Sequence, residues 1–211
     1  MIGSLVHKLL EDHARAWQDA EAEGSPLPTL ASLQSTGRKK LAALRLENTC
    51  ADKTTVDELD AMLANAHEMM LADRAEILEV EHTIIMPYEI NGQTHRMTAK
   101  IDRVDRVETG VRIVDYKTGG ASKTKLEPSD KDLQLGIYAM LIRHAMPDAD
   151  GYAQYWLVRT GQRGTINIAD LAMDKIQKKI EDAVCGMLAG EFPRKASSCS
   201  GLCDILFSDQ Q

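Results

Sequence analysis

Aromatic residues are scarce in this chain of 211 residues, where two Trp, five Tyr and two Phe make up only 4%. A surface that stacks the successive bases of a single strand would therefore have few side chains to use. Long apolar runs are also missing, since no stretch approaches the ~20 residues that a transmembrane helix needs. The first stretch, MIGSLVHKLLEDHARAW, carries acids and histidines at helical spacing and lacks the pattern of a signal peptide. These absences predict a protein without a membrane span, with the cytoplasm as its expected compartment.

Positive charge is scarce as well. The chain has 25 Lys and Arg against 32 Asp and Glu, a formal net charge of −7. This balance excludes a protein held on nucleic acid by bulk positive charge alone, but it is compatible with a local basic groove beside an acidic site. It also predicts that nucleic-acid binding without a partner is weak and salt-sensitive.

Periodicity predicts the order ααα-βββ-α-ββ-α along a chain that is 44% hydrophobic. Asn91-Gly92 is a strong hairpin signal between the first two strands. Helices are expected over 3–23, 29–46, 54–78, 130–145 and 170–189, and strands over 77–90, 93–107, 111–117, 151–160 and 164–169, with a polar loop at 118–130. This order predicts an α/β fold with a central mixed β-sheet flanked by helices and a helical N-terminal region. We expect one domain over 1–211, made of a helical part (1–76), an αβ core (77–190) and an irregular tail (191–211).

The stretch GVRIVDYKTGG, residues 110–120, ends a predicted strand with a charged pair. Asp115 and Lys117 are two residues apart, so they share the face that carries the apolar Val111 and Ile113. A charge pair at the end of a buried strand is costly unless it is used.

Asp102 on the preceding strand is a candidate partner of that pair. A two-residue loop at 108–109 would place it opposite Asp115, and a loop at 109–110 would place it opposite Lys117. A three-residue loop with a bulge would break the shared face. With the face shared, two carboxylates and an ammonium converge and favour a magnesium site for phosphodiester hydrolysis. A plain cross-strand salt bridge is the alternative.

Four short stretches, GSLVHKLLE, IDRVD, IVDYKTG and LQLGIYA, occur in this order. Together they resemble the RecB-type branch of the PD-(D/E)XK nuclease superfamily, over nearly the whole chain. The resemblance implies a restriction-endonuclease-like core and a metal-dependent deoxyribonuclease. Such an enzyme would act on DNA ends or single strands in recombination or repair.

The resemblance also implies site residues. Mg²⁺ or Mn²⁺ would be held by His7, Asp102, Asp115 and the main-chain carbonyl of Tyr116. Glu81 stands where related proteins often carry an acid, so it is either a further site residue or an ordinary strand charge.

Other residues surround this centre in the sequence. Lys117 would be the catalytic lysine, and Gln134 and Tyr138 match the Q-x-x-x-Y motif on one helix face. Lys123 and Lys125 on the following loop either contact the DNA backbone or are solvated. The remaining histidines are expected at the surface or in packing: His13, His67, His82, His95 and His144.

Several features depart from the family pattern or leave alternatives open. Ala99 stands where many relatives have glycine. Cys50, Cys185, Cys199 and Cys203 do not match the usual spacing for an iron–sulfur cluster, which argues against one. The sequence has no phosphate-binding motor loop, so any helicase would be a partner subunit or a region outside these residues. The alternative functions are a catalytically silent DNA-binding or assembly module of a helicase–nuclease complex, and a CRISPR-adaptation-type exonuclease.

We expect the purified protein to be colourless, because the cysteine spacing does not favour an iron–sulfur cluster. Visible absorption spectroscopy of anaerobically purified protein checks this. A band near the blue end of the visible range would contradict the expectation and favour the CRISPR-adaptation-type enzyme.

Overall fold

The computed structural model describes residues 2–46, 53–108, 110–147 and 150–191. Within them, five strands form one sheet in the order β1-β2-β3-β4-β5, in which only the pairing of β3 with β4 is parallel. The strands are β1 (Glu76–Ile90), β2 (Gln93–Val107), β3 (Gly110–Lys117), β4 (Gly151–Leu157) and β5 (Gln162–Asn167). The predicted α/β class with a central mixed sheet is confirmed.

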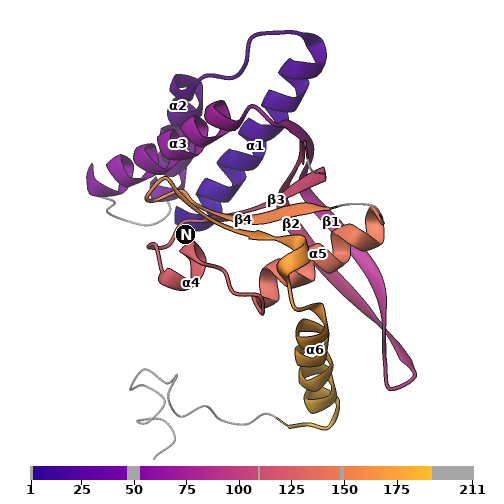
Figure 1. The fold of residues 1–211 in the computed structure, drawn as a ribbon. Helices are drawn as coiled ribbons and strands as arrows, with labels where there is room; N and C mark the ends of the chain where they lie inside the picture. Colours follow the sequence, from indigo (N-terminus) through magenta and orange to yellow (C-terminus); the bar gives the residue numbers. More distant parts are fainter. Residues whose placement is uncertain (1, 47–52, 109, 148–149, 192–211) are drawn as a thin grey trace, which may run out of the picture.

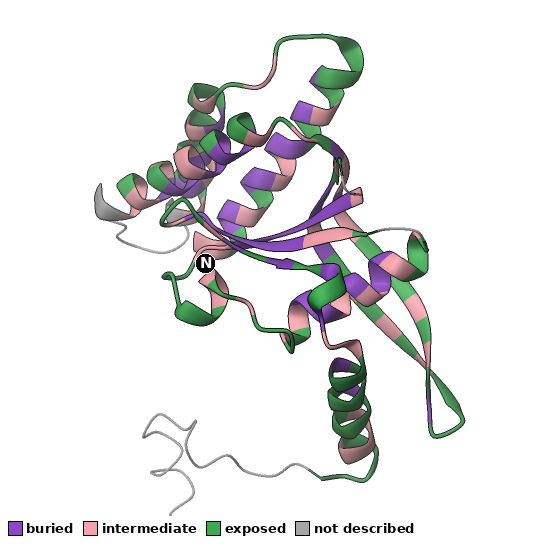
Figure 2. Cartoon of the chain, viewed as in Figure 1, coloured by how far each residue is buried: buried purple, intermediate pink, exposed green. Residues whose placement is uncertain are grey.

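Helices cover both faces of the sheet, as Figure 1 shows. On one face lie α1 (Ile2–Glu23), α2 (Leu30–Leu46) and α3 (Lys53–Asp73); on the other lie α5 (Leu133–Ala145) and α6 (Met173–Leu188). Alternate residues of β3 serve the two cores, with Val114 in the first and Ile113 in the second. The central strands are the most buried part of the chain (Figure 2). None of the described helices is long and apolar enough to span a membrane.

Several elements differ from the sequence prediction. The helix α5 begins at Leu133 rather than at residue 130, β4 ends at Leu157 rather than at residue 160, and β5 spans Gln162–Asn167 rather than 164–169.

The helix α3 ends at Asp73, although the prediction extended it to residue 78. The next residue, Arg74, has a positive φ of 44°, which is incompatible with a continued α-helix. The predicted polar loop contains a single helical turn, α4 (Lys123–Leu126). The last helix begins at Met173, because a 3₁₀ turn, η1 (Ile168–Asp170), precedes it. Residues 192–211 of the predicted tail lie outside the described residues, and Cys50 does too.

The hairpin of β1 and β2 is much longer than the other strands and extends beyond them (Figure 1). Its turn is the predicted one: Asn91 and Gly92 have φ values of 52° and 73°, and Ile90 pairs with Gln93.

The register of β2 against β3 is fixed by buried charges. Asp105 stands opposite Arg112, and its Oδ2 accepts from Arg112 Nη2 at 2.7 Å. Arg103 Nε lies 2.9 Å from Asp105 Oδ1, and all three side chains are at most 4% exposed. Val107 pairs with Gly110, which is the first of the two registers considered, and the ladder runs from there to Arg103 opposite Val114. A one-residue slip would leave a buried carboxylate without its guanidinium, which is strongly unfavourable.

Two of the remaining histidines form a buried pair in the helical layer. His13 Nε2 lies 3.0 Å from His67 Nδ1, and both rings pack near Trp17. Burial lowers the pKa of His13 to about 4 and also lowers the pKa of His67. Both pKa values therefore lie below 7, so the pair is neutral at pH 7, and only one of the two facing nitrogens carries a proton.

This pair predicts an acid-sensitive fold. The folded-state pKa of His13 lies below its usual value near 6.5, so the unfolded chain binds the proton more readily and stability falls as pH drops from about 6.5 to about 4. The loss from His13 approaches about 3 kcal/mol. We expect His13→Gln to flatten this part of the stability–pH curve, measured by urea unfolding at each pH. An unchanged slope in the variant would contradict the assignment.

Candidate active site

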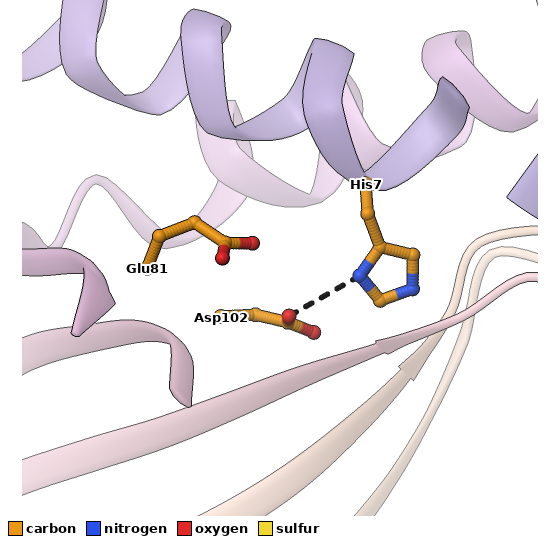
Figure 3. A group of neighbouring side chains, drawn as sticks. All are labelled: His7, Glu81 and Asp102. Atoms are coloured by element: carbon orange, nitrogen blue, oxygen red, sulfur yellow. Dashed lines mark hydrogen bonds and ion pairs between the residues drawn. The ribbon is translucent and has the colours of Figure 1, made fainter. Parts of the chain in front are cut away.

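The first helix reaches the end of β3 through a glycine. A Cβ atom on Gly3 would lie 2.9 Å from Thr118 Oγ1, so a larger residue here would require the Thr118 side chain to shift. One turn later, His7 points at β2 (Figure 3), and its Nδ1 donates to Asp102 Oδ1 at 3.2 Å. The helix α1 therefore contributes an imidazole to a site on the sheet.

Asp102 and Glu81 lie at an interruption of the hairpin ladder. Val80 pairs with Arg103 and His82 with Ile101, whereas the pair between them, 81 and 102, is missing. Glu81 adopts a positive φ of 53°, an unfavourable conformation for a residue with a side chain. Strain of this kind tends to persist where a site uses it.

The two carboxylates and the imidazole form a possible ligand set. The ligand atoms of His7, Glu81 and Asp102 all lie within 4.8 Å of one another, and each residue is half-buried. Figure 3 shows the three side chains pointing toward one another. They line an open pocket of about 480 Å³, whose rim carries Lys8 and Lys100. Lys100 forms an ion pair with Glu81. Two carboxylates with one imidazole are donors that suit a divalent cation, so the residues present fit a metal centre.

A second group of side chains surrounds Asp115, which is 3% exposed. Gln134 Nε2 donates to Asp115 Oδ1 at 2.7 Å, while Gln134 Oε1 accepts from Lys117 Nζ at 2.9 Å. Tyr138 OH donates to the same Asp115 oxygen at 3.3 Å. Lys117 Nζ lies 2.6 Å from Asp115 Oδ2, so this buried oxygen is paired with the ammonium group.

The backbone of Tyr116 connects the two groups. The β2–β3 ladder ends at Arg103 and Val114, and beyond it the Tyr116 N–H donates to Asp102 Oδ2 at 2.7 Å. Asp102 thus binds the imidazole with one oxygen and the neighbouring strand with the other. Its carboxylate is held in a single orientation between the two groups.

Protonation in the site reflects these contacts. The hydrogen bond to Asp102 raises the pKa of His7, although burial opposes it, and the charge of Asp115 adds to the increase. Burial raises the pKa of the Asp115 carboxyl, the Lys117 ammonium opposes this, and the charge of Asp102 adds to it. Burial raises the pKa of Tyr138 as well, which keeps its hydroxyl protonated as a donor. The two acids therefore interact electrostatically, the condition under which a cation is favoured.

The structure divides the predicted site residues in two. It brings His7 and Asp102 into one cluster and Asp115, Lys117, Gln134 and Tyr138 into another. Among the described residues, Asp115 is outside the three-member ligand set, and Glu81 takes part instead. The contact that the structure gives Tyr116 is made by its N–H; a role for its carbonyl stays a prediction.

The sequence contains a signal that could have located Glu81 opposite Asp102. A two-residue turn at Asn91-Gly92 pairs Ile90 with Gln93, and counting back along both strands sets Glu81 opposite Asp102. The hairpin signal and the acid together identify it.

Comparison with known proteins agrees with this geometry. A sequence model of the PD-(D/E)XK nuclease superfamily matches residues 1–206. The chain belongs to this superfamily, and the fold described above is its restriction-endonuclease-like core.

Two individual proteins are similar to the chain. The Gene 69 protein of Mycobacterium phage L5 is 26% identical over 132 residues, which are 59% of this chain and 43% of that protein. The chain therefore spans less than half the length of this curated relative. The solved structure of a candidate exonuclease from Eubacterium rectale shares the fold, with a TM-score of 0.53 and 14% identity over 100% of this chain and 75% of that one.

We expect Glu81→Gln to weaken Mn²⁺ binding at least tenfold, because it removes one anionic donor of the cluster. Isothermal titration of the protein with Mn²⁺ measures this. Glu79→Gln is the matched control, since Glu79 lies on the same strand but pairs with His82 away from the cluster. Equal affinities for the two variants would remove Glu81 from the ligand set.

Proposed function

We propose that this protein is a metal-dependent deoxyribonuclease of the RecB-type branch. It would hydrolyse phosphodiester bonds at DNA ends or in single strands, in recombination or repair. The observation that carries the proposal is the half-buried cluster of His7, Glu81 and Asp102 beside the Asp115–Lys117 pair. Superfamily membership supports hydrolysis as the reaction.

The metal would be held by His7, Glu81 and Asp102. Asp115 is a further ligand candidate, because its buried Oδ2 is paired with the Lys117 ammonium and, as a carboxylate oxygen, has a second lone pair for a cation. A divalent cation in this position supplies Lewis acidity toward a phosphate oxygen and lowers the pKa of a bound water. Mg²⁺ and Mn²⁺ both suit carboxylate ligands.

Lys117 would supply the positive charge that the reaction needs. Its ammonium is held from two sides, by Asp115 and by Gln134 Oε1, so its position is fixed before substrate arrives. A preorganised cation stabilises the charge that develops on the phosphate in the transition state. Gln134 acts as the positioning residue, since its amide binds Asp115 and Lys117 at once.

The proposed nuclease is tested with end-labelled single-stranded and double-stranded linear DNA and with a closed circle. Each is incubated with Mg²⁺, Mn²⁺ or EDTA. We expect metal-dependent cleavage that Lys117→Ala lowers by about 10²-fold or more. Lys178→Ala, which removes an exposed lysine of α6, serves as the control and should retain activity.

The circle separates the two modes of cutting, because an enzyme that requires ends leaves it intact. Absence of cleavage by folded protein with either metal would sink the proposal. It would favour the silent DNA-binding or assembly module.

A further inference from the structure

The short helix α4 is anchored to the sheet, although it follows a glycine pair in a polar segment. A Cβ atom on Gly164 of β5 would lie only 1.8 Å from the carbonyl oxygen of Lys125, so the backbone of α4 rests directly on this strand. Residues 122–127 also form their own hydrogen-bonded turn, in which the N–H groups of Lys125 and Leu126 donate to the Ser122 carbonyl. Lys125 therefore projects from a fixed backbone.

The two lysines of α4 differ sharply in their surroundings. The side chain of Lys123 is 87% exposed, and its ammonium lies 3.9 Å from Glu127. The side chain of Lys125 is only 31% exposed, and its Nζ lies 3.7 Å from the centroid of the Tyr155 ring. From the sequence, both lysines were expected on one loop, either in contact with the DNA backbone or solvated. The structure shows that their surroundings differ.

The Tyr155 ring joins Lys125 to the candidate active site. Tyr155 pairs with Asp115 across the parallel strands β3 and β4, and Lys117 Nζ lies 5.1 Å from the same ring centroid. Tyr155 OH donates to Asp132 Oδ1 at 2.8 Å, which orients the ring that both ammonium groups approach. Two positive charges thus converge on one side chain next to Asp115.

Nothing in the described part of the chain accepts a hydrogen bond from Lys125. The facing carboxylate is Asp132, whose Oδ2 is 3.8 Å away and whose Oδ1 serves the Tyr155 hydroxyl and the Leu135 N–H. Burial lowers the pKa of Lys125, the charge of Lys117 adds to this and Asp132 opposes it. The carboxylates of Asp132 and Asp115 offset part of the repulsion between the two ammonium groups, and the Nζ donors of Lys125 stay available to a further anion.

We propose that Lys125 binds a backbone phosphate of the DNA strand next to the phosphate that is cleaved. This inference rests on the proposed nuclease function and adds a substrate requirement to it. Lys117 is engaged by Asp115 and Gln134, whereas Lys125 has free donors that a second phosphate oxygen can accept. The substrate is therefore a strand with at least two phosphates, and a diester with a single phosphate does not use Lys125.

The first measurement is DNA binding without cleavage. A fluorescently labelled single-stranded oligonucleotide is titrated with wild-type, Lys125→Met, Lys125→Arg and Lys123→Met protein in EDTA, at several salt concentrations. Loss of one phosphate contact should lower the slope of log K against log[salt] by about 0.7 in Lys125→Met. Lys125→Arg keeps the charge and should retain the slope. Lys123→Met removes the exposed lysine and should also retain it.

The second measurement is turnover with Mn²⁺. We expect Lys125→Met to raise KM for the oligonucleotide about five- to tenfold, while turnover of bis(p-nitrophenyl) phosphate stays at the wild-type rate. Methionine preserves the packing of the side chain on Tyr155, and thermal unfolding confirms that the variant is folded.

A wild-type slope and KM in Lys125→Met would overturn the inference. An equal loss on the one-phosphate substrate would overturn it too, since that result assigns Lys125 to the reaction itself or to structure. If the wild-type protein cleaves neither substrate, the nuclease proposal fails, and the salt slope still decides whether Lys125 binds phosphate.

Discussion

The buried ion pairs of Asp105 are the constraint on which the candidate site depends. Asp105 faces Arg112 across the strands and Arg103 two residues earlier on its own strand. The guanidinium of Arg103 also packs on the Trp156 ring, 4.3 Å from its centroid, and extends the contact to β4. Any other register of β2 on β3 would bury an unpaired charge, so Asp102 has one place relative to Asp115. The polar core thus specifies position where apolar packing alone would tolerate a slip.

That register places two acids near each other without joining them in one ligand set. Asp102 turns to the imidazole of α1, and Asp115 turns to the amide of α5. Each carboxylate is thus bound by a different helical layer, although the charges of the two acids still interact. The site is built from both helical layers, and its geometry depends on how each layer packs on the sheet.

The sequence predicts the fold class and most of the candidate site residues. The features that it does not predict each have a physical reason. The Asn91-Gly92 turn fixed one hairpin because a two-residue turn leaves no freedom of register. The connection before Gly110 left two registers and a bulged loop open, and the choice rests on burial of Asp105 and Arg112, which no local pattern shows. The helix α4 is too short to give a periodic signal, and its place depends on a strand 39 residues away, at Gly164. Superfamily motifs identified His7 and Gln134, but not the division of their contacts between two groups.

The contact of His7 with Asp102 joins residues that are 95 positions apart in the chain. Closing a loop of this length costs entropy before the contact can be made, so it is a contact that slows folding. The imidazole arrives only when α1 has docked on a completed hairpin. A chain that has folded its sheet but not yet its first helix would hold the acids without their third partner. The order of assembly itself would then keep an immature protein from carrying a complete centre.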